Sequence, residues 1–112
     1  MKLLVVVMNS QEHVQDVLEA LLELDVRGAT IIDTEGVMQM LAEEAPIFAG
    51  LRHMFSGTKE HNKTIFGLTE RDDVLPELEA VLKEVDVDLT APGTGYAFTV
   101  PVDGAIESEE EE

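Results

Sequence analysis

The chain has 112 residues, of which 45% are hydrophobic, and these values are typical of one globular domain with a modest core. Its formal net charge of −17 argues against nucleic acid and anionic lipid surfaces as partners, because both would be repelled. The absence of cysteine excludes disulfides and thiolate metal sites and fits a cytoplasmic protein, and no apolar run is long enough to span a membrane.

The first third of the chain predicts a strand, a helix and a second strand. Residues 3–8 (LLVVVM) form a continuous apolar run, typical of a strand that is buried on both faces and central in its sheet. Residues 29–35 (ATIIDTE) predict the second strand, which ends at Gly36. Between them, helical spacing predicts a helix whose buried stripe is Val14, Val17, Leu18, Leu21 and Leu24.

A long connection follows the second strand. Residues 37–62 contain no strand pattern, and connections of this length are commonly functional or disordered. The stretch is too rich in apolar and aromatic groups for a disordered linker. These groups either cover the protein's own core or form a docking surface for a partner protein. The docking residues that we predict are Ile47, Phe48, Leu51, Arg52, Met54 and Phe55.

The remaining third predicts another strand, a helix and a last strand. Residues 63–68 (KTIFGL) predict the third strand, and Val74, Leu78, Val81, Leu82 and Val85 form the stripe of a second helix. Residues 96–102 (YAFTVPV) predict the fourth strand, and Pro101 places it at an edge because proline cannot donate to a sheet ladder. Residues 106–112 form an acidic tail that we expect to be solvated and disordered.

This order of elements predicts an α+β fold. Two β-α-β halves joined by a long loop give a ferredoxin-like sandwich, an antiparallel sheet with both helices on one face, in a single domain over residues 1–105. The first strand is apolar on both faces, so the face without helices needs a cover. A second subunit would supply this cover.

The chain resembles the PII nitrogen-regulatory and PII-like signal-transduction proteins. The resemblance rests on the order of elements, on the long connection in the position of the family's T-loop, and on Gly36. Residues 93–102 (GTGYAFTVPV) are similar to the family's glycine turn and final strand, and residues 103–106 (DGAI) to the segment after it. The resemblance implies a homotrimer that binds an adenine nucleotide or related small effector between subunits. It also implies T-loops that dock on a transporter, an enzyme or a regulator.

The resemblance also implies a set of ligand-binding residues. Gly36 and Gln39 match the base of the T-loop, and Lys63 is the nearest match to a lysine before the third strand. The backbone amides of the glycine turn face phosphate in the family. The full set is Gly36, Gln39, Lys63, Gly93, Thr94, Gly95 and Tyr96.

The chain departs from the family where phosphate is held. The family usually has a lysine directly after its glycine turn, where this chain has Tyr96, and arginines after its last strand. No Lys or Arg follows Lys83 here, although triphosphate binding depends on such cations. We therefore predict that ATP binds weakly or not at all. The alternative function is an interaction protein of the same fold with a degenerate cleft.

Neither a catalytic nor a metal constellation is evident. His53, Glu60 and His61 share the long connection, but their spacing fits no strong zinc pattern. No nucleophile can be paired with a base at a characteristic spacing. We therefore expect no catalytic residues, no metal site and no enzymatic activity.

Overall fold

The computed structural model describes residues 1–37 and 61–109. Gln39 and all six predicted docking residues therefore lie outside the described residues. The elements in chain order are β1 (Lys2–Met8), a 3-10 turn η1 (Gln11–His13), α1 (Val14–Glu23), β2 (Arg27–Glu35), β3 (His61–Thr69), α3 (Val74–Glu84) and β4 (Gly95–Pro101).

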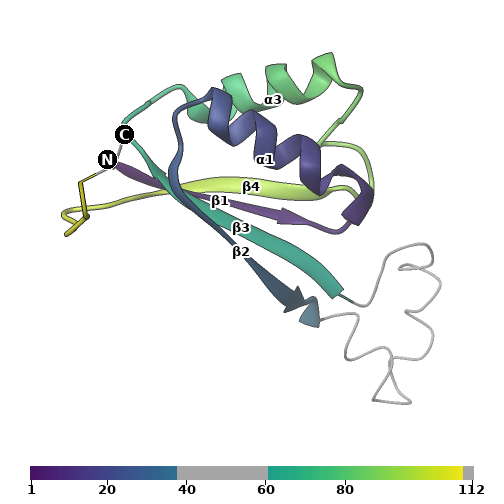
Figure 1. The fold of residues 1–112 in the computed structure, drawn as a ribbon. Coiled ribbons are helices and arrows are strands. Elements are labelled where there is room, and N and C mark those ends of the chain that lie inside the picture. Colours follow the sequence, from purple (N-terminus) through teal and green to yellow (C-terminus); the bar gives the residue numbers. More distant parts are fainter. Residues whose placement is uncertain (38–60, 110–112) are drawn as a thin grey trace.

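The four strands form one sheet in the order β2-β3-β1-β4, and all neighbouring strands are antiparallel. Both helices lie on the same face of this sheet (Figure 1). This is the ferredoxin-like arrangement that the order of elements predicts. The continuous apolar run of β1 correctly predicts a central strand, and Pro101 correctly places β4 at an edge.

The core lies between the helices and the sheet. Leu4, Val6 and Met8 alternate along β1 and are fully buried against the helices, with Ile65 of β3 beside them. Buried helix residues complete this core: Val17, Ala20, Leu21, Val74, Leu78 and Leu82. The apolar stripes with helical spacing thus meet one face of the sheet, because a strand directs every second side chain toward it.

Both helices end in the same left-handed cap. Asp25 after α1 has φ 58° and Asp86 after α3 has φ 62°. In α1 the next amide, that of Val26, donates to Leu21 O at 3.0 Å, and in α3 the corresponding bond joins Val87 to Leu82 at 2.9 Å. These bonds define the Schellman motif, which usually places glycine at the left-handed position. Here aspartate takes that position after both helices, and the nearest glycine, Gly28, lies inside β2.

Glycine at these caps should stabilise the protein. We expect Asp25→Gly and Asp86→Gly each to raise the free energy of unfolding by about 0.5–1 kcal/mol, since a left-handed backbone is strained for residues with a Cβ. Chemical denaturation measures this change. Asp25→Asn is the control, because it removes an unfavourable charge at the helix end but keeps the side chain. A loss of stability in both glycine variants would contradict the assignment.

The face of the sheet opposite the helices is apolar. Val5 of β1 lies between Phe66 of β3 and Phe98 of β4, and Leu3 lies in the next row between Leu68 and Val100. Phe98 and Val100 are each 42% exposed. We call this surface the open face, because no helix of the described ranges covers it (Figure 1).

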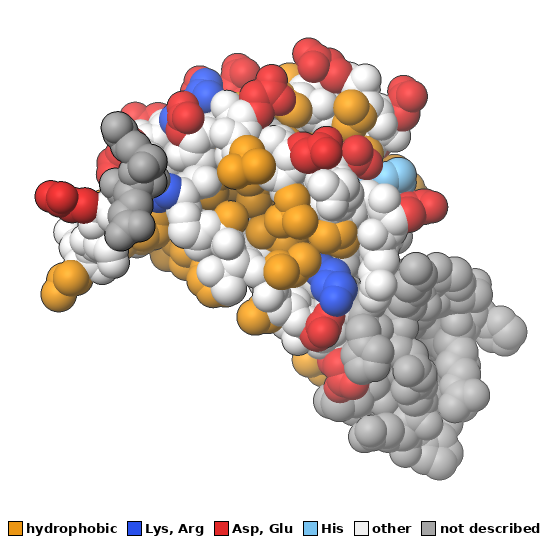
Figure 2. Space-filling view, viewed as in Figure 1, with side chains coloured by type: hydrophobic (Ala, Val, Ile, Leu, Met, Phe, Trp, Pro, Cys, Tyr) orange, Lys and Arg blue, Asp and Glu red, His pale blue; other side chains and the backbone are white. Residues whose placement is uncertain are grey.

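The helix layer is more acidic than the surface over the strands. Figure 2 shows acidic side chains crowded along the helix layer, with hydrophobic side chains gathered over the strands. Contact through the sheet would therefore bring fewer carboxylates together than contact through the helix layer seen in Figure 2. Among the described residues, no helix is long and apolar enough to cross a membrane.

Candidate functional site

One end of the sheet collects the residues that the sequence singled out. Gly95 at the start of β4 pairs with Met8, Met8 pairs with Lys63, and Lys63 pairs with Asp33. These four residues form one row across the sheet, so Gly95 and Lys63 are about 10 Å apart at the usual strand spacing. Gly36 follows the last residue of β2 at the same end. The two roots of the long connection thus lie at the same end of the sheet as the glycine turn, with β1 between β3 and the turn (Figure 1).

The glycine turn is fixed by close backbone packing. Gly93 has φ 80° and Gly95 has φ 151°, both in the region that disfavours a Cβ. A Cβ at Gly95 would lie 2.1 Å from Val7 O, so the turn sits directly against β1. The Asn9 amide donates to Thr94 O at 2.9 Å, which ties the turn to the end of β1.

A polar network joins this turn to the roots of the long connection. Asn62 is 7% exposed; its Nδ2 donates to Asn9 Oδ1 at 3.3 Å, and its Oδ1 accepts from Thr34 Oγ1. Thr34 Oγ1 also lies 2.9 Å from Thr64 Oγ1. The network spans β2, β3 and the end of β1. Because buried polar groups are costly when unpaired, these bonds hold the three strand ends in one arrangement.

The sequence did not reveal this network. We expected the third strand to begin at Lys63, but β3 begins two residues earlier, at His61. Asn62 therefore belongs to the strand, although it was assigned to the long connection. An asparagine beside a strand more often signals a turn, so its place in the ladder could be found only from the register.

The other predicted ligand-binding residues have partners of their own. Lys63 Nζ forms an ion pair with Asp33, so part of its charge is neutralised within the sheet. Tyr96 lies on the open face, where its ring stacks on that of Phe98 with centroids 6.2 Å apart and an interplanar angle of 15°. The structure thus brings Gly36, Lys63, Gly93, Thr94 and Gly95 to one end of the sheet, and directs Tyr96 to the open face.

Comparison with solved structures identifies the fold as PII-like. The chain is similar to PII of Arabidopsis thaliana in a crystal structure bound to citrate, with a TM-score of 0.54. The two share 17% sequence identity over 90% of this chain and 76% of that chain. At this identity the likeness shows the fold alone. No family model matches the sequence, and no curated protein sequence matches it.

Proposed function

We propose that the protein is a PII-like regulatory subunit. It binds a small effector in a cleft between subunits and docks a partner protein through the long connection between β2 and β3. The observation that carries this proposal is the convergence of both roots of that connection with the glycine turn at one end of the sheet. The network through Asn62 and Asn9 would couple an effector at the turn to the position of the connection's roots.

The assembly that we propose is a homotrimer. The open face presents apolar residues of three strands that remain partly exposed in a single chain. Closed symmetric assemblies are the usual way to bury such a face, and the PII-like fold favours three copies. Copies that meet through this face would keep their acidic helices apart, which the net charge of −17 requires.

The effector that we propose carries less negative charge than ATP. Lys63 is paired with Asp33, and no Lys or Arg follows Lys83 in the sequence. Backbone amides of a glycine turn can hold one anionic group but not three in such an acidic protein. The similar Arabidopsis protein is bound to citrate, so carboxylates belong on the list of test compounds. The charge argument favours compounds with one anionic group over citrate itself, which has three carboxylates.

A ligand panel tests the effector. We expect magnesium-ATP to leave the thermal midpoint unchanged, whereas a true effector at a hundred times its Kd should stabilise by about 2.7 kcal/mol. The panel should contain magnesium-ATP, ADP, AMP, adenosine and citrate, with calorimetry near physiological salt to confirm each hit. A submicromolar Kd for magnesium-ATP would contradict the charge argument.

A second candidate function is an interaction protein of the same fold with a degenerate cleft. The Lys63–Asp33 ion pair favours it, because this lysine is then not free for an anionic ligand. In that case no member of the panel would shift the thermal midpoint, while the assembly would persist. In both functions we propose that Ile47, Phe48, Leu51, Arg52, Met54 and Phe55 contact the partner protein, because aromatic and aliphatic anchors dominate interfaces.

A further inference from the structure

The segment after β4 crosses the whole width of the sheet. It starts at the β4 edge, where the Val102 amide donates to Met1 O at 3.0 Å. Five residues later, Glu107 forms an ion pair with Arg27 at the start of β2, which is the strand at the opposite edge of the sheet. We call residues 102–109 the strap. It lies at the end of the sheet away from the glycine turn, because Pro101 pairs with Lys2 at the beginning of β1.

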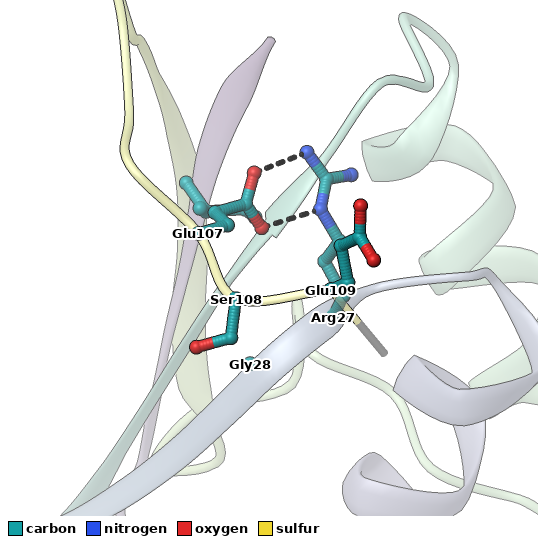
Figure 3. A pocket seen from close by; sticks show the side chains of 6 residues that line it. Arg27, Gly28, Glu107, Ser108 and Glu109 are labelled. Carbon is teal, nitrogen blue, oxygen red and sulfur yellow. Dashed lines mark hydrogen bonds and ion pairs between the residues drawn. The ribbon is translucent and has the colours of Figure 1, made fainter. Parts of the chain in front are cut away.

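The strap is fastened by a two-point ion pair. Arg27 Nε lies 2.7 Å from Glu107 Oε2 and Arg27 Nη2 lies 3.0 Å from Glu107 Oε1 (Figure 3). We call this pair the clasp. Glu70 also accepts from Arg27 Nη2 at 3.1 Å and lies 3.4 Å from the Met1 amino group. Glu70 therefore orients the guanidinium so that its remaining edge can receive the Glu107 carboxylate.

Most of the strap is exposed to solvent. Residues 103–109 are exposed and form no helix or strand. An open pocket of about 780 Å³ is lined on one side by Arg27, Gly28 and Leu68, and on the other by residues 107–109. The strap thus stands away from the sheet, held by the Val102 hydrogen bond at one end and the clasp at the other. Leu68 belongs to the open face, so the strap also shapes the rim of that face.

We propose that the strap exchanges between two forms. In the closed form the clasp holds it at the β2 edge, and in the open form it is released because the attraction between Arg27 and Glu107 is removed. Exposed ion pairs are individually weak, so the closed and open forms are close in free energy and small changes shift their populations. The glutamates of residues 107–112 are repelled by the acidic body and favour opening once the clasp is lost. Salt near 1 M, where the screening length is only about 3 Å, should therefore open the strap.

Acid should open the strap as well. The hydrogen bond from Arg27 holds the pKa of Glu107 below its usual range. The other charged groups around the clasp are Glu70, the Met1 amino group and Glu109. Because the pKa of Glu107 is lowered, the clasp is fully present above the ordinary carboxylate pKa and is lost as pH falls through the lowered value.

Two matched variants test the strap. Glu107→Gln and Glu109→Gln each remove one negative charge from the same pocket, but Glu107→Gln alone removes the clasp. A spin label at Gly104→Cys reports strap motion, because the chain has no other cysteine and a Cβ at this position would meet no atom within 4 Å. We expect Glu107→Gln to increase the mobile fraction of the label about two- to fivefold at low salt, as loss of one exposed ion pair allows.

Two further observations complete the test. The mobile fraction of the label should rise in high salt in the parent protein and in Glu109→Gln. In Glu107→Gln it should not rise with salt, because no clasp remains to be weakened. The Arg27 Nε–H signal in a ¹⁵N spectrum should be slow to exchange in the parent and lost in Glu107→Gln. Equal label mobility in the two variants would overturn the proposal. Loss of the Arg27 signal without a change in the mobility of the label would also overturn it, because the ion pair would then not restrain the strap.

Discussion

Gly95→Ala should destabilise the protein by about 3–5 kcal/mol, the sum expected of an unfavourable backbone conformation and a forced steric contact. Gly95 has φ 151°, and a Cβ there would lie 2.1 Å from Val7 O and 3.2 Å from Met8 Cα. Both neighbours are backbone of the central strand, which cannot move without disturbing the core. The substitution should therefore separate β4 from β1 and displace the glycine turn.

Gly104→Ala is the matched control. A Cβ at Gly104 would meet no atom within 4 Å, so this variant should stay within about 0.5 kcal/mol of the parent. Urea denaturation of the three proteins at equal chain concentration gives the comparison. If Gly95→Ala lowered the free energy of unfolding by less than about 1 kcal/mol, the turn could not lie as close to β1 as described.

Phe98→Asp should separate the subunits. Phe98 lies on the open face next to Val5 and is 42% exposed in the single chain, so a polar group there should be tolerated by the folded subunit. In the proposed trimer the same position would bury an unpaired carboxylate, which costs several kcal/mol. Sedimentation should then show single chains where the parent shows the assembly.

Leu22→Asp is the control for added charge. Leu22 lies on α1 and is 75% exposed, so its substitution adds the same negative charge to the helix layer and not to the open face. We expect this variant to remain assembled. Dissociation of both variants would indicate that net charge, and not burial of the open face, determines the assembly.

The sequence predicts most of the fold because its dominant signals are local. A continuous apolar run that contains several β-branched residues is typical of a central strand, and β1 is central. A proline late in the last strand permits an edge, and β4 is an edge. Residues 85–89 (VDVDL) alternate apolar and acidic side chains, a pattern that fits either a short strand or a linker; they contain the left-handed cap after α3. Aspartate at a helix end is a weak cap signal, so this motif could not be found in advance.

The contacts around the site were harder to predict because they depend on register and on distant pairs. Asn62 reaches Asn9 across 53 positions, and Arg27 reaches Glu107 across 80. Neither pair leaves a local pattern, since each depends on which strand ends lie side by side. The acidic tail was expected to be free in solvent by its composition. A single arginine at the far edge of the sheet is enough to hold Glu107, and no compositional rule identifies it.

The central claim is that the open face is buried between copies of this chain, as a PII-like regulatory subunit requires. Sedimentation equilibrium of the unmodified protein at micromolar concentration tests it most directly. The chain has a mass of 12.3 kDa, and we predict a single species with the mass of three chains. A stable single chain across this concentration range would leave the apolar open face in water, and would contradict both the trimer and the intersubunit cleft.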